Sequence, residues 1–187
     1  MWDAAACILA VNAPWLVTFR YLALSGFPWM LLCLAALCAA DALPASMRQP
    51  GVAWHQVASL TLCVDVLQTA CHRAAHTWLR GTVVGRSHAV HHTHVRPTPQ
   101  DAFHTGLVDA TFQLVAPLVA ALHLVQPLRH SAIAFGCAYS WWLLFLHSSP
   151  DVDYPRLRRL RLVTPKLHHA HHRDPTVHFA SVLRPLG

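Results

Sequence analysis

The sequence predicts an all-α integral membrane protein, with a four-helix membrane arrangement and a cytoplasmic cap of histidine-rich helices. Of the 187 residues, 55% are hydrophobic and only 12% are charged, whereas a soluble domain carries about 25% charged residues. Four apolar stretches are long enough to form buried or membrane helices, and many of the 16 histidines gather in short clusters beside them. The length fits a single domain over residues 1–187.

The four apolar stretches set the predicted helices. They occupy residues of about 21–43, 52–71, 105–128 and 131–147. A membrane-crossing helix needs about 20 mostly apolar residues, with a lower limit of about 17, and the first stretch clearly satisfies this. The second and third contain Asp65 and Asp109, and the fourth is short, so buried helices of a soluble α-protein are the alternative for these three. A short link around 127–131 predicts a tight hairpin between the last two helices.

The positions of the basic residues favour the membrane alternative. If four helices cross the membrane, 12 of the 14 Lys and Arg residues fall on one side, and only Arg48 and Arg129 fall on the other. Short loops rich in Lys and Arg remain in the cytoplasm, and 13 of the 16 histidines lie on that same side. The predicted location is therefore the bacterial inner membrane or the endoplasmic reticulum, with the histidine clusters on the cytoplasmic side.

Other compositional features exclude several classes of protein. The formal charge is +6, but no basic and aromatic run is typical of a nucleic-acid module, so no nucleic-acid partner is expected. The six cysteines include no Cys-x-x-Cys pair, which argues against a disulfide framework or a thiolate zinc site and favours a reducing compartment. The N-terminus lacks the pattern of a removable signal peptide, so the first apolar stretch is expected to remain as a span.

Three histidine clusters, at residues 72–76, 88–92 and 168–172, predict a metal site. The last two repeat one spacing, i, i+3 and i+4, which places the imidazoles on one helical face. Without a metal, three imidazoles in one turn would partly charge and repel one another near neutral pH. One further histidine lies at the cytoplasmic end of the fourth predicted span. The predicted metal ligands are His72, His76, His88, His91, His92, His147, His168, His171 and His172.

Nine imidazoles are enough for two metal ions, but they do not identify the metal. Imidazole binds zinc, copper, iron and nickel alike. The Glu-x-x-His pattern of soluble di-iron bundles is absent from the sequence. The residues alone therefore predict a histidine-rich site for two metals.

The ordered clusters resemble the fatty acid hydroxylase and sterol desaturase superfamily. The similarity lies in His72-Arg-x-x-His76, His88-x-x-His91-His92 and His168-x-x-His171-His172, and it extends over about residues 65–183. Residues 91–104 are similar to the sterol C5-desaturase branch, and residues 147–168 to bacterial members.

The resemblance implies a reaction and its partners. Such proteins are integral membrane enzymes that bind two iron ions through histidine, and they use O2 to hydroxylate or desaturate a lipid of sterol or fatty acyl type. Their electrons come from an external donor protein such as cytochrome b5 or ferredoxin. The substrate, the choice between hydroxylation and desaturation, and the donor remain open.

Three further residues are expected to contact the ligand imidazoles and so to support the metal site. Asp65 lies seven residues before His72 on roughly the same helical face, and we expect its carboxylate to accept a hydrogen bond from a ligand imidazole. His104 could be a tenth metal ligand or could donate a hydrogen bond to a ligand, and we expect the second. His178 replaces the Asn that the family commonly has before an aromatic residue and Gly or Ala, and it could support the ligands or add one. The C-terminal tail after this triplet is short compared with the family, and we expect it to be truncated.

Two alternatives to an active enzyme remain. A metal-handling membrane protein, such as a zinc transporter or chaperone, would also use histidine clusters. Transporters place ionisable ligands near the middle of the membrane, however, whereas these clusters lie at one face. A catalytically impaired relative is compatible with the short C-terminus.

Overall fold

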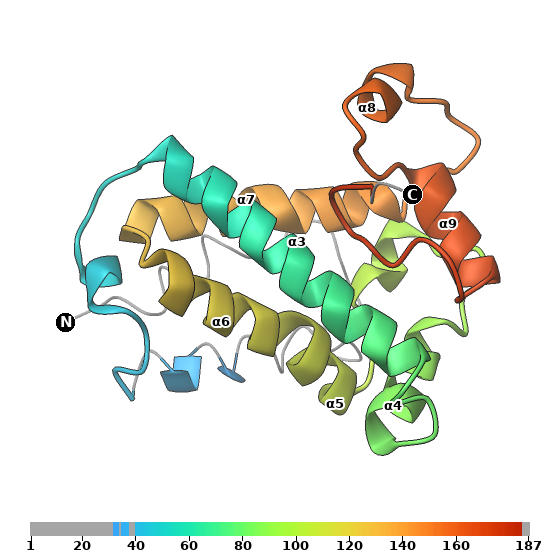
Figure 1. The fold of residues 1–187 in the computed structure, drawn as a ribbon, viewed down its shortest axis with the longest axis horizontal. Helices are drawn as coiled ribbons and strands as arrows, with labels where there is room; N and C mark the ends of the chain where they lie inside the picture. Colours follow the sequence, from blue (N-terminus) through green and yellow to red (C-terminus); the bar gives the residue numbers. More distant parts are fainter. Residues whose placement is uncertain (1–31, 34, 38–39, 185–187) are drawn as a thin grey trace.

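Three long helices packed side by side form the body of the molecule (Figure 1). The computed structural model describes residues 32–33, 35–37 and 40–184, and these residues are all-α apart from one isolated β-bridge. Helix α3 (Trp54–His76) packs against both α6 (Ala116–Val125) and α7 (Arg129–Leu146). The all-α prediction is confirmed.

Helix α6 is the second half of a longer helix that contains an irregular turn. This helix runs from Leu107 to Val125. It begins as α5 (Leu107–Ala110), widens into the π-helical turn η4 (Thr111–Val115) and continues as α6. A π-helical turn within an α-helix is frequently found at a functional site.

Short helices gather at the end of the bundle where α3 and α7 end (Figure 1). They are α4 (Val83–His91), the 3-10 helix η3 (Pro99–Phe103), α8 (Pro155–Arg159) and α9 (Pro165–Arg173), while η2 (Ala45–Arg48) lies elsewhere. A proline begins η3, α8 and α9, because the first helical position needs no N–H donor. Every predicted metal ligand lies in or beside this end of the bundle.

An apolar core holds the three long helices together. Leu60 of α3 is 0% exposed and packs with Leu122 of α6 and Phe135 of α7. Burying one side chain of this size stabilises a fold by about 1.5–3 kcal/mol. The hairpin predicted between the last two helices is present, since α6 ends at Val125 and α7 begins at Arg129.

One helix among the described residues is long and apolar enough to cross a membrane, namely Leu107–Val125. The first predicted span, 21–43, lies largely outside the described residues. Predicted spans 52–71 and 131–147 are helical, but polar residues such as Asp65 and Gln68 in α3 and Arg129 at the start of α7 lower their hydropathy. The prediction of four spans is therefore supported for one helix of the described part.

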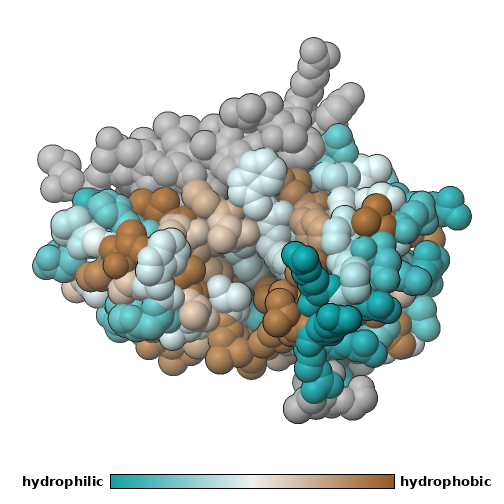
Figure 2. Space-filling view, turned by 90° about the horizontal axis from the view of Figure 1, so that it is seen from above, coloured by the Kyte–Doolittle hydropathy of each residue, from teal (hydrophilic) through white to brown (hydrophobic). Residues whose placement is uncertain are grey.

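The surface of the bundle exposes hydrophobic side chains. Leu62 and Val66 on α3 are 51% and 59% exposed, and Leu124 on α6 is 69% exposed. Figure 2 shows hydrophobic patches over the helices, while the most strongly hydrophilic surface lies toward the end that carries α8 and α9.

The segment after α9 is fastened to the bundle by one buried carboxylate. Asp65, 3% exposed on α3, accepts hydrogen bonds from the backbone N–H groups of Ser181, Val182 and Leu183 at 3.1, 2.8 and 2.9 Å. The Trp142 indole N–H of α7 also donates to the Ser181 carbonyl at 2.7 Å. The segment consequently lies against α3 and α7, beside the histidine clusters.

Replacing Asp65 with Ala is expected to free this segment. Three buried N–H groups would lose a charged acceptor, and each hydrogen bond to a charged group contributes about 1.5–3 kcal/mol. Amide hydrogen exchange at residues 181–183, followed by mass spectrometry, should accelerate roughly tenfold or more in the variant. Asp151→Ala, a change of an exposed aspartate in a loop, is the control and should leave this exchange unchanged. Equal exchange rates in both variants would contradict the fastening role.

Candidate metal centre

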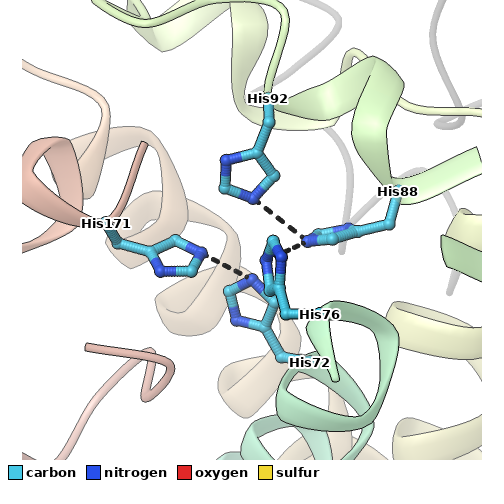
Figure 3. A group of neighbouring side chains, drawn as sticks. All are labelled: His72, His76, His88, His92 and His171. Atoms are coloured by element: carbon cyan, nitrogen blue, oxygen red, sulfur yellow. Dashed lines mark hydrogen bonds between the residues drawn. The ribbon is translucent and has the colours of Figure 1, made fainter. Parts of the chain in front are cut away.

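The nine predicted ligands converge in two groups. Within each group the candidate ligand atoms all lie within 4.8 Å of one another. Figure 3 shows the first group, in which imidazoles from α3, α4 and α9 point toward a common centre. The first group is His72, His76, His88, His92 and His171. The second group is His91, His147, His168 and His172.

Local helical geometry explains how each cluster serves its group. His72 and His76 are one turn apart at the end of α3, so both imidazoles leave the same face. In α4 and α9 the pattern i, i+3, i+4 divides its members between the two groups. Gly85 allows α4 to lie directly on the turn that follows α3, since a side chain there would clash with the backbone of Leu79 and Arg80.

The two groups adjoin one another. The ring centroids of His92 in the first group and His172 in the second are 4.7 Å apart, and those of His171 and His168 are 6.4 Å apart. Most of the rings are shielded from solvent, and His171 is fully buried at 0% exposure. The arrangement is one continuous binuclear site rather than two separate ones.

Six of the nine imidazoles use Nδ1 to donate a hydrogen bond to an acceptor outside the two groups. A carbonyl or carboxylate oxygen can only accept, so Nδ1 of each of these rings carries a proton, and in the neutral imidazole Nε2 then carries a bare lone pair. The six bonds are His72 to Phe179 O (2.8 Å), His91 to His104 O (3.3 Å), His147 to Leu143 O (2.8 Å), His171 to Val177 O (2.6 Å), His172 to His94 O (3.1 Å) and His88 to Asp109 Oδ1 (2.9 Å).

The bare Nε2 atoms face one another at short distances. The Nε2 atoms of His72 and His171 are 2.9 Å apart, although neither carries a proton to share. In the second group, Nε2 of His168 lies 3.1 and 3.2 Å from the bare Nε2 atoms of His147 and His172, and it has at most one proton for the two. Facing lone pairs repel unless a cation lies between them. The donor set therefore fits a metal ion in each group.

The spacing between nitrogens can be compared with that around a bound metal ion. A metal that binds imidazole nitrogen at about 2.1 Å separates two ligands by roughly 3.0 Å at a right angle and by roughly 3.4 Å at a tetrahedral angle. The closest Nε2 pairs are 2.9 to 3.2 Å apart. This spacing lies close to the separation of neighbouring imidazole nitrogens that share one metal ion.

The carboxylate that contacts a ligand is Asp109 rather than Asp65. Asp109 is 3% exposed in α5, accepts from His88 Nδ1 and is also bonded by the Thr105 hydroxyl. Asp65, expected to bond an imidazole, bonds three backbone N–H groups instead. It supports the site indirectly, because the segment that it fastens carries the Phe179 carbonyl at His72.

The other two expected supporting residues contribute through their backbone. The carbonyl of His104, not its ring, accepts from His91. His178 belongs to neither group, but the carbonyls on either side of it, Val177 and Phe179, accept from His171 and His72. Its φ of 57° is left-handed, a conformation that Asn and His adopt more readily than most residues. The replacement of the family's Asn by His at this position is therefore conformationally conservative.

The imidazoles are held neutral and ready to bind metal. Burial lowers the pKa of His76 to about 3, and the neighbouring His88 and His171 add to this shift. Burial also lowers the pKa of His171 to about 4. Burial and neighbouring imidazoles lower the pKa of His91 and His92 as well. At neutral pH these rings are uncharged, so each has one nitrogen lone pair that can bind a cation.

An all-α bundle with nine imidazoles in two adjoining groups defines a helical protein with a site able to hold two metal ions. The sequence pattern of the fatty acid hydroxylase family matches residues 57–186. The chain belongs to the fatty acid hydroxylase family, whose members are membrane-bound di-iron hydroxylases and desaturases. The resemblance inferred from the three histidine clusters is confirmed.

Part of the chain is also similar to an enzyme of known activity. The alternative squalene epoxidase of Phaeodactylum tricornutum is 36% identical over 92 residues, which cover 46% of this chain and 26% of the relative. The chain thus spans about a quarter of that relative's length. No solved structure matches the chain.

Removing one ligand from either group should reduce the bound metal. His171→Ala in the first group and His91→Ala in the second should each lower the number of metal ions bound per chain, measured by inductively coupled plasma mass spectrometry. The exposed His55, which belongs to neither group, provides the control variant His55→Ala with unchanged metal content. A metal content equal to that of the wild type in both ligand variants would rule out this site.

The metal-free protein should lose stability as the pH falls below about 6.5. An unfolded histidine titrates near 6.5, whereas folded His171 titrates near 4, so the unfolded state binds more protons between these values. Through His171 alone, the free energy of unfolding of the protein should then fall by about 1.4 kcal/mol for each pH unit in this window. Thermal unfolding of chelator-treated protein, followed by tryptophan fluorescence at pH 7.5 and 5.5, measures this. A melting temperature that does not fall would refute the prediction.

Proposed function

We propose that the chain is an O2-dependent di-iron oxidoreductase that hydroxylates or desaturates a lipid of sterol or fatty acyl type. One observation carries the proposal: two adjoining groups of imidazoles bring Nε2 atoms to within 2.9 to 3.2 Å of one another, and six of these rings donate a hydrogen bond through Nδ1. Membership of a family of di-iron hydroxylases and desaturases supports iron as the metal.

In this proposal each group holds one iron. Once bound, the two irons supply the activation of O2 that removes hydrogen from an unactivated C–H bond. The chain's own residues orient the ligands: Asp109 fixes the ring of His88, and the Phe179 carbonyl fixes the ring of His72. Burial of the rings excludes water from the reaction, which protects reactive species from side reactions.

The reaction requires two electrons from outside the chain. Hydroxylation converts R–H, O2, two electrons and two protons into R–OH and H2O. Desaturation converts –CH2–CH2–, O2, two electrons and two protons into –CH=CH– and two H2O. We propose a donor protein such as cytochrome b5 or ferredoxin. An exposed basic strip next to α9 would suit an acidic donor; it comprises Arg156, Arg158, Arg159 and Arg161.

We propose that the bundle is embedded in a membrane with the metal site on the cytoplasmic side, in the bacterial inner membrane or the endoplasmic reticulum. The apolar helix Leu107–Val125 and the exposed hydrophobic side chains of α3 support this placement. So does the excess of Lys and Arg on the side that carries the histidines.

Lipid profiling under ¹⁸O2 tests the proposed reaction. Cells expressing the chain, compared with cells expressing His171→Ala, should accumulate a lipid that has either gained one ¹⁸O atom or lost two hydrogens. The variant should reduce this product at least a hundredfold, because the first group loses a fully buried ligand. His55→Ala should retain full product formation.

Two results would count against the proposal. A purified chain with two irons that changes no lipid when supplied with O2 and a reductant would refute an oxidoreductase. A chain that retains zinc in preference to iron would favour a metal-handling role.

A further inference from the structure

A cavity extends from the metal ligands into the helix bundle. Its first part, of about 60 Å³, is lined by His91, His147 and His168 on one side and by Gln113 and Leu143 on another. A second part, of about 50 Å³, lies among α3, η4 and α7. The two parts share lining residues, among them Gln113 and Leu143, so they adjoin.

One polar side chain in this cavity has no partner. Gln113 is 6% exposed, and neither its amide oxygen nor its amide nitrogen makes a hydrogen bond among the described residues. Such groups are rare in folded proteins because each unsatisfied donor or acceptor costs free energy. The amide of Gln113 lines both parts of the cavity, so it can donate a hydrogen bond to a ligand and accept one from it.

The backbone explains why this costly residue faces the cavity. Pro117 has no N–H to donate to the carbonyl of Gln113 four residues earlier. The preceding turn is π-helical, with the Ala116 N–H bonded to the Thr111 carbonyl five residues before it. The wider turn changes the direction in which Gln113 leaves the helix relative to a regular α-helix.

The surroundings of Gln113 select the kind of ligand. No Lys or Arg lines either part of the cavity within the described residues, so no basic side chain is available beside Gln113 to pair with a carboxylate. The carboxylate of Asp109 is already bonded to His88 and Thr105. A pure hydrocarbon would leave Gln113 unpaired. A neutral hydroxyl both donates and accepts, and it matches the amide.

We propose that Gln113 binds a hydroxyl group of the lipid substrate, and that oxidation occurs within a few carbon atoms of that hydroxyl. The second half follows because the amide of Gln113 and the candidate metal ligands line the same small cavity. This inference rests on the proposed function, and it narrows the substrate class to lipid alcohols.

Paired probes that differ by one hydroxyl test the inference. Two pairs of compounds are used: cholestanol with cholestane, and hexadecan-1-ol with hexadecane. The affinity of the iron-loaded chain in detergent for each compound is measured by competition against the tritiated alcohol of the same pair. The wild type should bind at least one alcohol tenfold or more tightly than its hydrocarbon. Gln113→Leu should abolish that preference by weakening the alcohol alone. Gln100→Leu makes the same change at an exposed position and should preserve the preference.

The same variant carries a second readout that a structural role would not produce. Because Gln113→Leu removes two unsatisfied polar atoms, its melting temperature without lipid should rise. Gln113→Met provides a second apolar variant if leucine packs poorly. A lowered melting temperature in both variants would mean that Gln113 serves the fold, and would overturn the inference.

Failure of this inference is separable from failure of the proposed function. If the wild type binds each hydrocarbon as tightly as its alcohol, or binds neither alcohol, the inference is wrong. Two bound irons and an ¹⁸O-labelled or desaturated lipid would leave the proposed function standing in that case. Absence of iron or of any oxidised lipid would overturn the proposed function itself.

Discussion

The hydrogen bonds donated by Nδ1 are the constraint on which the site depends. Each one fixes both the rotation of an imidazole and the position of its proton, and so leaves Nε2 without a proton. Facing lone pairs at about 3 Å are unfavourable for the protein alone. A bound metal ion would remove this repulsion, and in its absence the surrounding packing has to hold the rings together.

The groups that hold the imidazoles in place come from parts of the chain far from the histidine clusters. The acceptors for His72 and His171 are backbone carbonyls of the segment after α9, and this segment is held by Asp65 in the middle of α3. Backbone carbonyls are insensitive to the side chain at their own position. The residues that decide whether they stay in place lie elsewhere, which makes Asp65 important without any contact to a ligand ring.

The grouping of the histidines was easier to predict from the sequence than the residues that orient them. Helical spacing is a local property, so the clusters at 72–76, 88–92 and 168–172 could be expected to present imidazoles on single faces, and the structure brings them together. Ser181, whose N–H donates to Asp65, is 116 residues further along the sequence, and helical spacing cannot predict a contact between residues so far apart in the chain. Asp109 could have been noticed as an ionisable residue in an apolar stretch, but its pairing with His88 depends on how α4 meets α5.

The same distinction applies to the fold. Apolar stretches predicted the long helices and the α6–α7 hairpin, because burial follows the periodicity of the sequence. Membrane crossing is harder to predict for α3 and α7, since a helix that carries buried polar groups such as Asp65 and Gln68 resembles a core helix of a soluble protein. The unpaired amide of Gln113 was unpredictable, because a π-helical turn leaves little mark on composition beyond one proline.

The placement of the acceptor segment has a consequence for how the protein is made. The histidines of α3 leave the ribosome about 100 residues before His171. Val177 and Phe179, whose carbonyls orient the rings, emerge after His171, and the segment 181–183 that Asp65 fastens emerges last. Until then the first group lacks His171, and the ring of His72 lacks the carbonyl that orients it. Stable loading of metal must therefore follow synthesis of this segment, and nascent chains expose a partial set of histidines that any available divalent ion can occupy first.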